Sequence, residues 1–249
     1  MKSFIGDLHI HTVLSPCGDL EMSPDNIIRR AADLNLDIIG ITDHNSTRQC
    51  NLIRQMGEDA GILVLCGAEV TSREEVHCLT YFETPAQLEE FQHYLDQNLP
   101  DIPNDPRLFG HQVVVDDMNN IIYTEERSLL MALTQRLDEI ASRVRRLQGL
   151  FIPAHIDRPR FGILGQLGFF PLELMVDAVE LSPNSNQESL RALFPDIFKH
   201  SFIGGSDAHF LHQMGTWKTV FRMREPSFAE IRRCLHRKAG VSAVIDTLT

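Results

Sequence analysis

The chain has 249 residues, a length typical of one α/β barrel domain of roughly 200–250 residues. Its 43% hydrophobic and 23% charged residues allow a sizeable core and exclude a largely disordered chain. The net charge of −11 argues against a protein that holds nucleic acid mainly through a basic surface, although bound divalent cations would reverse the charge locally.

Short apolar runs, which predict β-strands, alternate with helical patterns along most of the chain. The predicted strands are 3–10, 37–42, 62–69, 76–82, 150–154, 178–181 and 202–205. The predicted helices are 24–35, 47–60, 85–97, 125–147 and 227–238. In the first helix, Ser23 is the expected N-cap and Pro24 takes the first helical position. The alternation predicts a mostly parallel sheet, open or closed into a barrel.

Residues 98–124 interrupt this alternation. They contain three prolines, an apolar run, a turn at 118–120 and a second apolar run. This pattern predicts a proline-rich loop and a β-hairpin inserted into the barrel. Apart from the insertion at about 98–124, we interpret residues 1–249 as a single barrel domain, because the sequence shows no repeat and no linker.

The cysteine count and the apolar segments bear on the location of the protein. Five cysteines without a CxxC pair indicate reduced thiols rather than a disulfide framework. The N-terminal residues lack the apolar stretch of a signal peptide, and no segment approaches the ~20 apolar residues of a membrane span. We therefore expect a cytoplasmic protein that does not bind membranes. The sequence leaves the oligomeric state open.

Histidines and carboxylates follow the predicted strands at the points where these strands end. The first strand alternates Asp7, His9 and His11 with apolar residues, so that all three lie on one face. The carboxyl ends of parallel strands meet at one rim of a barrel, and we expect these side chains to converge there. The later strands end in similar residues, namely Asp43, His44, Glu69, His77, His155, Asp207 and His209.

This set of side chains predicts a metal centre. Histidine, aspartate and glutamate together are ligands of zinc, manganese or iron rather than of calcium or magnesium alone. Six imidazoles at one rim would repel one another if protonated, and bound metal ions remove this repulsion. One histidine at a strand end is usually an ordinary polar residue, so the prediction depends on the recurrence of the pattern. The other five histidines lack such neighbours and are expected to be surface or packing residues.

The motifs resemble those of the PHP (polymerase and histidinol phosphatase) family, in the family's order and up to about residue 210. They are HIH at 9–11, TDH at 42–44, Glu69 with His77, PAH at 153–155 and SDAH at 206–209. The resemblance implies a distorted (β/α)7 barrel with a trinuclear centre, in which phosphoester hydrolysis is the usual chemistry. It implies two to three divalent transition-metal ions, which are zinc, manganese or iron.

The resemblance also implies a ligand set for each ion. These sets are His9, His11, Glu69 and Asp207 for the first ion; a bridging Glu69 with His77 and His155 for the second; and His44, His209 and one further ligand for the third. Many members supply that last ligand as His or Asp soon after the HxH, where this chain has SPCGD at 15–19. Asp19 is the preferred candidate, and the Cys17 thiolate, a good zinc ligand, is the alternative. A third possibility is that Cys17 packs and Asp19 caps a turn.

Phosphoester hydrolysis requires a nucleophilic water and relief of charge on the phosphoryl oxygens, which a pair of metal ions supplies. The predicted catalytic residues are Asp207, His209 and Glu69. Arg158 and Arg160, just after His155, are predicted to bind substrate phosphate, with Arg73 as a weaker candidate. Each of these arginines is otherwise a solvated loop residue. Asp7 and Asp43 are candidates either for orienting imidazoles or for capping nearby backbone.

We expect a phosphoric ester hydrolase, a phosphatase or phosphodiesterase that acts on a small phosphorylated metabolite or nucleotide through a metal-activated water. Two alternatives belong to other classes. A nuclease that trims nucleic-acid ends is disfavoured by the negative charge and the absence of a basic stripe, so nucleic acid is expected only as a substrate. A non-catalytic metal-binding barrel is disfavoured by the near-complete ligand set.

Overall fold

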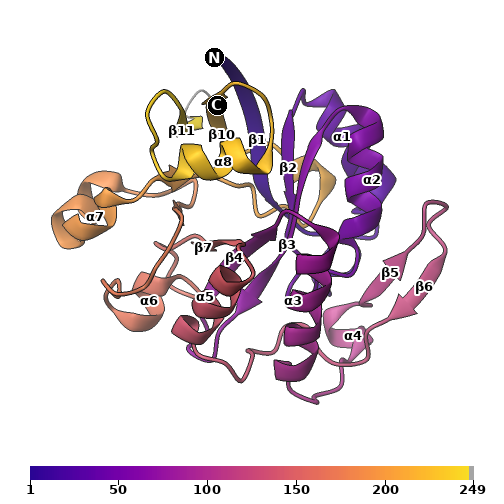
Figure 1. The fold of residues 1–249 in the computed structure, drawn as a ribbon. Helices are drawn as coiled ribbons and strands as arrows, with labels where there is room; N and C mark the ends of the chain where they lie inside the picture. Colours follow the sequence, from indigo (N-terminus) through magenta and orange to yellow (C-terminus); the bar gives the residue numbers. More distant parts are fainter. Residues whose placement is uncertain (247–249) are drawn as a thin grey trace.

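The computed structural model describes residues 1–246 and shows a mixed α/β fold. A curled sheet of seven strands forms the centre, and helices pack around it (Figure 1). The strand order is β11–β10–β1–β2–β3–β4–β7. The bounds of these strands are β1 Lys2–Ile10, β2 Ile38–Ile41, β3 Leu63–Thr71, β4 His77–Phe82, β7 Leu150–Pro153, β10 Lys218–Met223 and β11 Ser242–Asp246.

The described part of the chain also contains two smaller sheets, eight α-helices and two short 3₁₀ helices, Pro195–Lys199 and Leu211–Gln213. The small sheets are the hairpin of β5 Val113–Val115 with β6 Ile121–Thr124, and the pair of β8 Val179–Glu180 with β9 Phe202–Ile203. The α-helices are α1 Pro24–Asp33, α2 Cys50–Ala60, α3 Pro85–Asn98, α4 Pro106–Phe109, α5 Leu137–Arg146, α6 Ile163–Leu167, α7 Gln187–Leu193 and α8 Phe228–Leu235. Each of these helices is too short or too polar to cross a lipid bilayer.

Helix α1 illustrates how the sequence sets local structure. Pro24 occupies the first turn, as predicted, because its fixed φ suits that position and its missing N–H leaves no donor unsatisfied. Ser23 is the N-cap residue, but its hydroxyl donates to Asp25 Oδ1 at 2.6 Å instead of capping the backbone. Ile27 and Ile28 face the core, and the burial of each contributes roughly 1.5–3 kcal/mol.

The prediction of a mostly parallel sheet is wrong for most of the pairings. β1, β2 and β3 pair in parallel, whereas β3–β4, β4–β7, β1–β10 and β10–β11 are antiparallel. Residues 72–76 join β3 to β4 and are too few for the crossover that parallel strands need. β4 therefore runs in the opposite direction. Its first residue, His77, lies at the end of the sheet where β3 finishes, opposite Thr71.

The β8–β9 pair lies between the two edge strands of the main sheet. β8 packs beside β7, and β9 packs beside β11. Two backbone hydrogen bonds of 2.9 Å, from Asp177 to Phe151 and from Ile156 to Glu180, join β7 to the β8 segment. The strands thus curl into a half-barrel, while the full (β/α)7 count stays a prediction. The interpretation as a single domain also stays a prediction.

The predicted hairpin in the insertion is present as β5 and β6, which project beside α2 (Figure 1). The side-chain amide of Gln49 fixes it through two hydrogen bonds with the Val115 backbone, of 2.9 and 3.0 Å. The predicted helix at 125–147 is wrong in its first half, since α5 begins at Leu137. Buried amides of Gln112 and Asn45 bind carbonyl oxygens of residues 125–131 and hold that segment irregular.

Gly67 on β3 has no room for a side chain beside β4, since a Cβ there would lie 1.5 Å from the Thr80 carbonyl oxygen. We predict that Gly67→Ala lowers the free energy of unfolding by about 2 kcal/mol or more, because the strands must separate. Urea denaturation followed by circular dichroism measures this change. Ala60→Gly, at the exposed end of α2, is the control, with an expected loss of about 1 kcal/mol or less. Equal losses in the two variants would contradict the prediction.

Candidate metal centre

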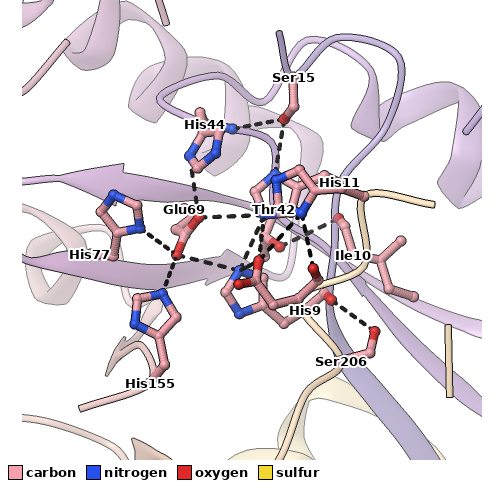
Figure 2. A network of polar contacts seen from close by, with 12 residues as sticks. His9, Ile10, His11, Ser15, Thr42, His44, Glu69, His77, His155 and Ser206 are labelled. Atoms are coloured by element: carbon pink, nitrogen blue, oxygen red, sulfur yellow. Dashed lines mark hydrogen bonds and ion pairs between the residues drawn. The ribbon is translucent and has the colours of Figure 1, made fainter. Parts of the chain in front are cut away.

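Six histidines and the carboxylates of Glu69 and Asp207 meet at one end of the half-barrel. Figure 2 shows His9, His11, His44, His77 and His155 around Glu69. They come from the end of β1, the loop after β2, β3 itself, the start of β4 and the segments after β7 and β9. Two backbone bridges bring these segments together: Ile10 pairs with Ala208, and His44 pairs with Glu69. The structure therefore brings together every predicted histidine and both predicted carboxylates of the catalytic set.

Glu69 lies at the middle of the cluster and is 1% exposed. Five imidazole nitrogens surround its carboxylate, at 2.8 Å for His77, 3.1 Å for His155, 3.2 Å for His44 and 3.4 Å for both His9 and His11. Burial by itself would raise the pKa of Glu69, but attraction to His77 and His9 holds it well below its usual range. Glu69 is therefore ionised.

The first donor group consists of His9, His11, Glu69 and Asp207, whose ligand atoms all lie within 4.8 Å of one another. The Nε2 atoms of His9 and His11 are 3.2 Å apart, and Asp207 Oδ1 lies 3.3 and 3.2 Å from them. Nitrogen and oxygen donors that converge on one point in this way suit a transition-metal ion. The same four residues are the first ligand set that the resemblance implies.

Two further donor groups share members with the first. They are His44 with Glu69 and His77, and His11 with His44 and His209. The second set implied by the resemblance differs in part, because the structure groups His44 rather than His155 with Glu69 and His77. His155 Nε2 still contacts Glu69 Oε1, which is the oxygen that His77 Nδ1 also contacts. The assignment of ligands to individual ions stays a prediction.

Buried partners orient three of the imidazoles. His11 Nδ1 donates to Ser15 Oγ at 2.9 Å, because that hydroxyl already donates to Asp43 Oδ1 at 2.7 Å. His209 Nδ1 donates to the Asp207 carbonyl oxygen at 2.9 Å. His9 Nδ1 donates to the carboxylate of Glu180, with both oxygens at 3.1 Å. For His9 and His11 this leaves Nε2 directed toward Glu69 and Asp207, as in carboxylate–histidine–metal arrangements.

Sequence reasoning missed Glu180. Its carboxylate also accepts from the backbone N–H of His155 at 2.9 Å. The residue as a whole is 1% exposed. Gly205 makes room for it, since a Cβ there would lie 2.6 Å from Glu180 Oε1. A signal was present, because a glutamate inside the apolar run of residues 178–181 has to find a partner when it is buried.

The protonation states of the cluster follow from burial and from the carboxylates. Burial would lower the pKa of His9, but nearby carboxylates, Glu180 first, raise it well above its usual range. Burial would also lower the pKa of His11, but hydrogen bonds to Asp207 and Glu69 and the charges of these carboxylates raise it to about 9. Burial and the charge of His11 lower the pKa of His209 to about 4. His9 and His11 therefore carry extra protons in the metal-free protein, while His209 is neutral.

One buried nitrogen beside Glu69 supports the fit to metal ions. Among the described residues, the Nδ1 atom of His44 is one of the buried polar atoms without a hydrogen-bond partner. His44 Nδ1 lies within ion-pair distance of Glu69 but not in a hydrogen-bonding direction. A buried polar atom without a partner is costly, and a metal ion is a suitable partner for an imidazole lone pair.

Neither candidate for the last ligand joins the donor groups described above. Asp19 Oδ1 accepts from the backbone N–H of Glu21 at 2.9 Å, so its carboxylate caps a turn, while its backbone N–H donates to the His209 carbonyl oxygen. Cys17 is exposed overall, but burial of its sulfur and the charge of Glu69 raise its thiol pKa to about 12. The last ligand of the third ion stays a prediction.

The three predicted arginines occupy different places. Arg158 reaches the centre, where its Nη1 donates to Asp207 Oδ2 at 2.6 Å. Arg160 and Arg73 have exposed side chains, for which no contact with the centre is found in residues 1–246. Asp43 is linked to His11 by hydrogen bonds through Ser15, and Asp7 accepts from the backbone of Ser206 and Gly215 instead of contacting an imidazole.

The fold and this cluster define a metal-binding α/β protein with the donor set of a hydrolytic centre. Residues 7–155, more than half of the chain, match the PHP domain, and residues 184–239 match the PHP-associated domain. The chain belongs to the PHP family, as the motifs predicted. Asp207 and His209, two of the predicted ligands, fall in the PHP-associated segment.

Three known proteins are similar to the chain in sequence or in fold. It is 23% identical to the uncharacterised protein YqxK of Bacillus subtilis over 94% of the chain and 62% of YqxK. The lesion-specific endonuclease PfuEndoQ of Pyrococcus furiosus has a similar fold, with a TM-score of 0.72 at 21% identity over 97% of this chain and 58% of that one. A protein of Bifidobacterium adolescentis, provisionally described as a metal-dependent phosphoesterase, gives 0.58 at 20% identity over 93% and 96% of the two chains. The chain thus spans less than two thirds of the first two proteins.

We predict that metal binding to the metal-free protein releases protons at pH 7.5. His11, with a pKa of about 9, and His9, with a raised pKa, must lose a proton before Nε2 can bind a metal ion. Apparent affinity for Mn²⁺ should therefore rise between pH 6.5 and 8.5, by about tenfold per pH unit for each proton released. Calorimetry in buffers of different ionisation enthalpy counts the protons. A pH-independent affinity would contradict the prediction.

We predict that Glu180→Gln weakens metal affinity by about 10–100-fold, because the amide retains the shape of the side chain but loses the charge that holds the His9 Nδ1 proton. Competition with a chelator measures the affinity of the tightest site. Glu188→Gln, on the exposed surface of α7, is the matched control and should bind metal like the wild type. Equal affinities in the two variants would assign Glu180 a packing role only.

Proposed function

We propose that this protein hydrolyses phosphate esters with two to three divalent transition-metal ions bound at the histidine and carboxylate cluster. The observation that carries the proposal is the buried Glu69 carboxylate with five imidazole nitrogens within 3.4 Å. Among residues 1–246, no lysine or arginine forms an ion pair with the Glu69 carboxylate. Such a donor set fits zinc, manganese or iron, and membership of the PHP family supports a hydrolytic use of these metals.

Bound metal ions would supply an acidified water and neutralise charge on the phosphoryl oxygens. The residues of the chain then have separate tasks. Asp207 remains ionised, since attraction to His9 outweighs burial and holds its pKa well below the usual range. It would hold the first ion through Oδ1 while Oδ2 keeps Arg158 in place. Arg158 offers its remaining N–H groups to a substrate phosphate, and neutral His209 can bind a metal ion or accept a proton.

The proposed substrate is a small phosphorylated metabolite or nucleotide. The net charge of −11 supports a substrate that is captured at the metal centre rather than along a basic surface. The second candidate is a nuclease. The similarity of fold to PfuEndoQ over 97% of this chain, with the highest TM-score of the structures compared above, favours it. Both candidate functions use the same metal centre. They differ in the group that is esterified to the phosphate, which is a small molecule in the first and a nucleic-acid strand in the second.

We predict that Asp207→Ala and His9→Ala each lower kcat by about 10³-fold or more, because each removes a ligand of the ion that activates water. Turnover on a library of phosphate esters with added Mn²⁺ or Zn²⁺ is the measurement, and bound metal is counted by elemental analysis. Asp117→Ala, an exposed acid in the hairpin, is the control and should retain full activity. Activity within tenfold of wild type in both ligand variants would place the chemistry elsewhere.

We predict faster turnover of small phosphate esters than of single-stranded oligonucleotides, when both are assayed with the same metal. The comparison is made on kcat/KM for the best ester and for a short oligonucleotide. Preference for the oligonucleotide would exchange the leading proposal for the nuclease. Metal-loaded protein that turns over neither substrate would favour the non-catalytic binding role.

A further inference from the structure

Phe161 is an exposed aromatic residue held in an unfavourable backbone conformation beside the metal centre. It is 40% exposed, and its φ of 62° lies in the left-handed region, where a bulky side chain is rare. His155 and Asp207, both at the centre, also have positive φ, of 28° and 53°. Strained backbone of this kind persists where the surroundings enforce it, and it is frequent at functional sites.

Backbone contacts set the path of the loop around Phe161. The Phe161 carbonyl oxygen accepts from the backbone N–H of His77 at 2.9 Å and so anchors the start of β4. At Gly162, a Cβ would lie 2.4 Å from the Arg158 carbonyl oxygen and 2.8 Å from that of His155, so the loop folds tightly on itself. The backbone provides these contacts, and none of them needs an aromatic ring at 161.

The aromatic ring of Phe161 takes no part in these backbone contacts. It stacks on the imidazole of His77, with 4.3 Å between centroids and 18° between planes. His77 Nδ1 in turn contacts Glu69, so the ring of Phe161 lies one residue away from the carboxylate at the middle of the cluster. An exposed aromatic ring fixed at this distance can stack with a flat, apolar ring whose phosphate reaches the centre.

We propose that Phe161 is a stacking platform for a nucleobase, so that the phosphate ester at the centre belongs to a nucleotide. The inference rests on the proposed function and specifies its substrate class. A nucleotide carries an aromatic base one sugar away from its phosphate, which matches an aromatic platform one residue away from the donor cluster. A neutral base is also not repelled by the acidic side chains of the centre. The nucleotide is either free or a unit of a strand.

Binding of two non-hydrolysable analogues tests the proposal on the zinc-loaded chain of 249 residues. The probes are adenosine 5′-methylenephosphonate and the corresponding ribose 5-methylenephosphonate, which lacks the base. Calorimetry should show at least tenfold tighter binding of the adenosine analogue by the wild type. Phe161→Leu should weaken binding of the adenosine analogue by about tenfold and leave the ribose analogue unchanged, and Phe161→Tyr should restore the preference.

Phe169→Leu is the matched control. Phe169 is 57% exposed and lines a cavity of about 440 Å³ between α5 and residues 167–175, whose lining includes none of the metal-centre residues. This variant should bind both analogues like the wild type. Zinc content is measured in every variant, so that a loss of metal through His77 is not taken for a loss of stacking.

Three results would overturn the stacking role. They are equal binding of the two analogues by the wild type, an unchanged preference in Phe161→Leu, and equal weakening of both analogues in that variant. A protein that shows the stacking preference but hydrolyses no phosphate ester would overturn the proposed reaction instead. A phosphorothioate oligonucleotide distinguishes the two sources of the base. If it binds more tightly than the adenosine analogue, in a way that depends on Phe161, the base belongs to a strand. If it binds more weakly than the adenosine analogue, the base belongs to a free nucleotide.

Discussion

The buried carboxylate of Glu69 is the constraint on which the rest of this structure depends. Removing a carboxylate from water costs several kcal/mol unless positive charge and hydrogen bonds replace the lost hydration. Here the neighbours are five imidazoles, which provide positive charge only when they are protonated or bound to a metal ion. The end of β1, the start of β4 and the segments after β2 and β7 all deliver a histidine to this one group, which lies on β3. The half-barrel is therefore arranged around a centre that needs cations.

A second layer of buried polar groups holds the imidazoles in one orientation. Glu180 fixes His9, and the Ser15–Asp43 pair fixes His11, so that the Nε2 atoms of both rings face each other at 3.2 Å. These carboxylates add negative charge to an already acidic chain. The centre would repel a phosphate in the absence of cations, so the proposed binding of a phosphate ester there requires bound metal ions.

Most of the fold could be predicted from local pattern, and the errors have identifiable causes. The apolar runs gave the seven predicted strands to within a few residues, because alternation and apolar runs report burial directly. The antiparallel direction of β4 depends on a five-residue connection. The irregular segment before α5 depends on buried amides, Asn45 among them, that come from distant parts of the chain. β10 and β11 were missed, although β10 pairs along β1 from Lys2 to Gly6 and makes the first strand an interior one.

The sequence by itself determined the chemistry of the centre: the donor types, their order along the chain and the family to which they belong. Local periodicity specifies which face of a strand a side chain occupies, and strand ends specify the rim. Only the tertiary structure decided which groups meet across that rim, because this depends on strand register and loop path. Glu180 contacts His9 across 171 positions, and Arg158 contacts Asp207 across 49. The place of Phe161 over His77 likewise follows from a tightly folded loop, which no periodic pattern encodes.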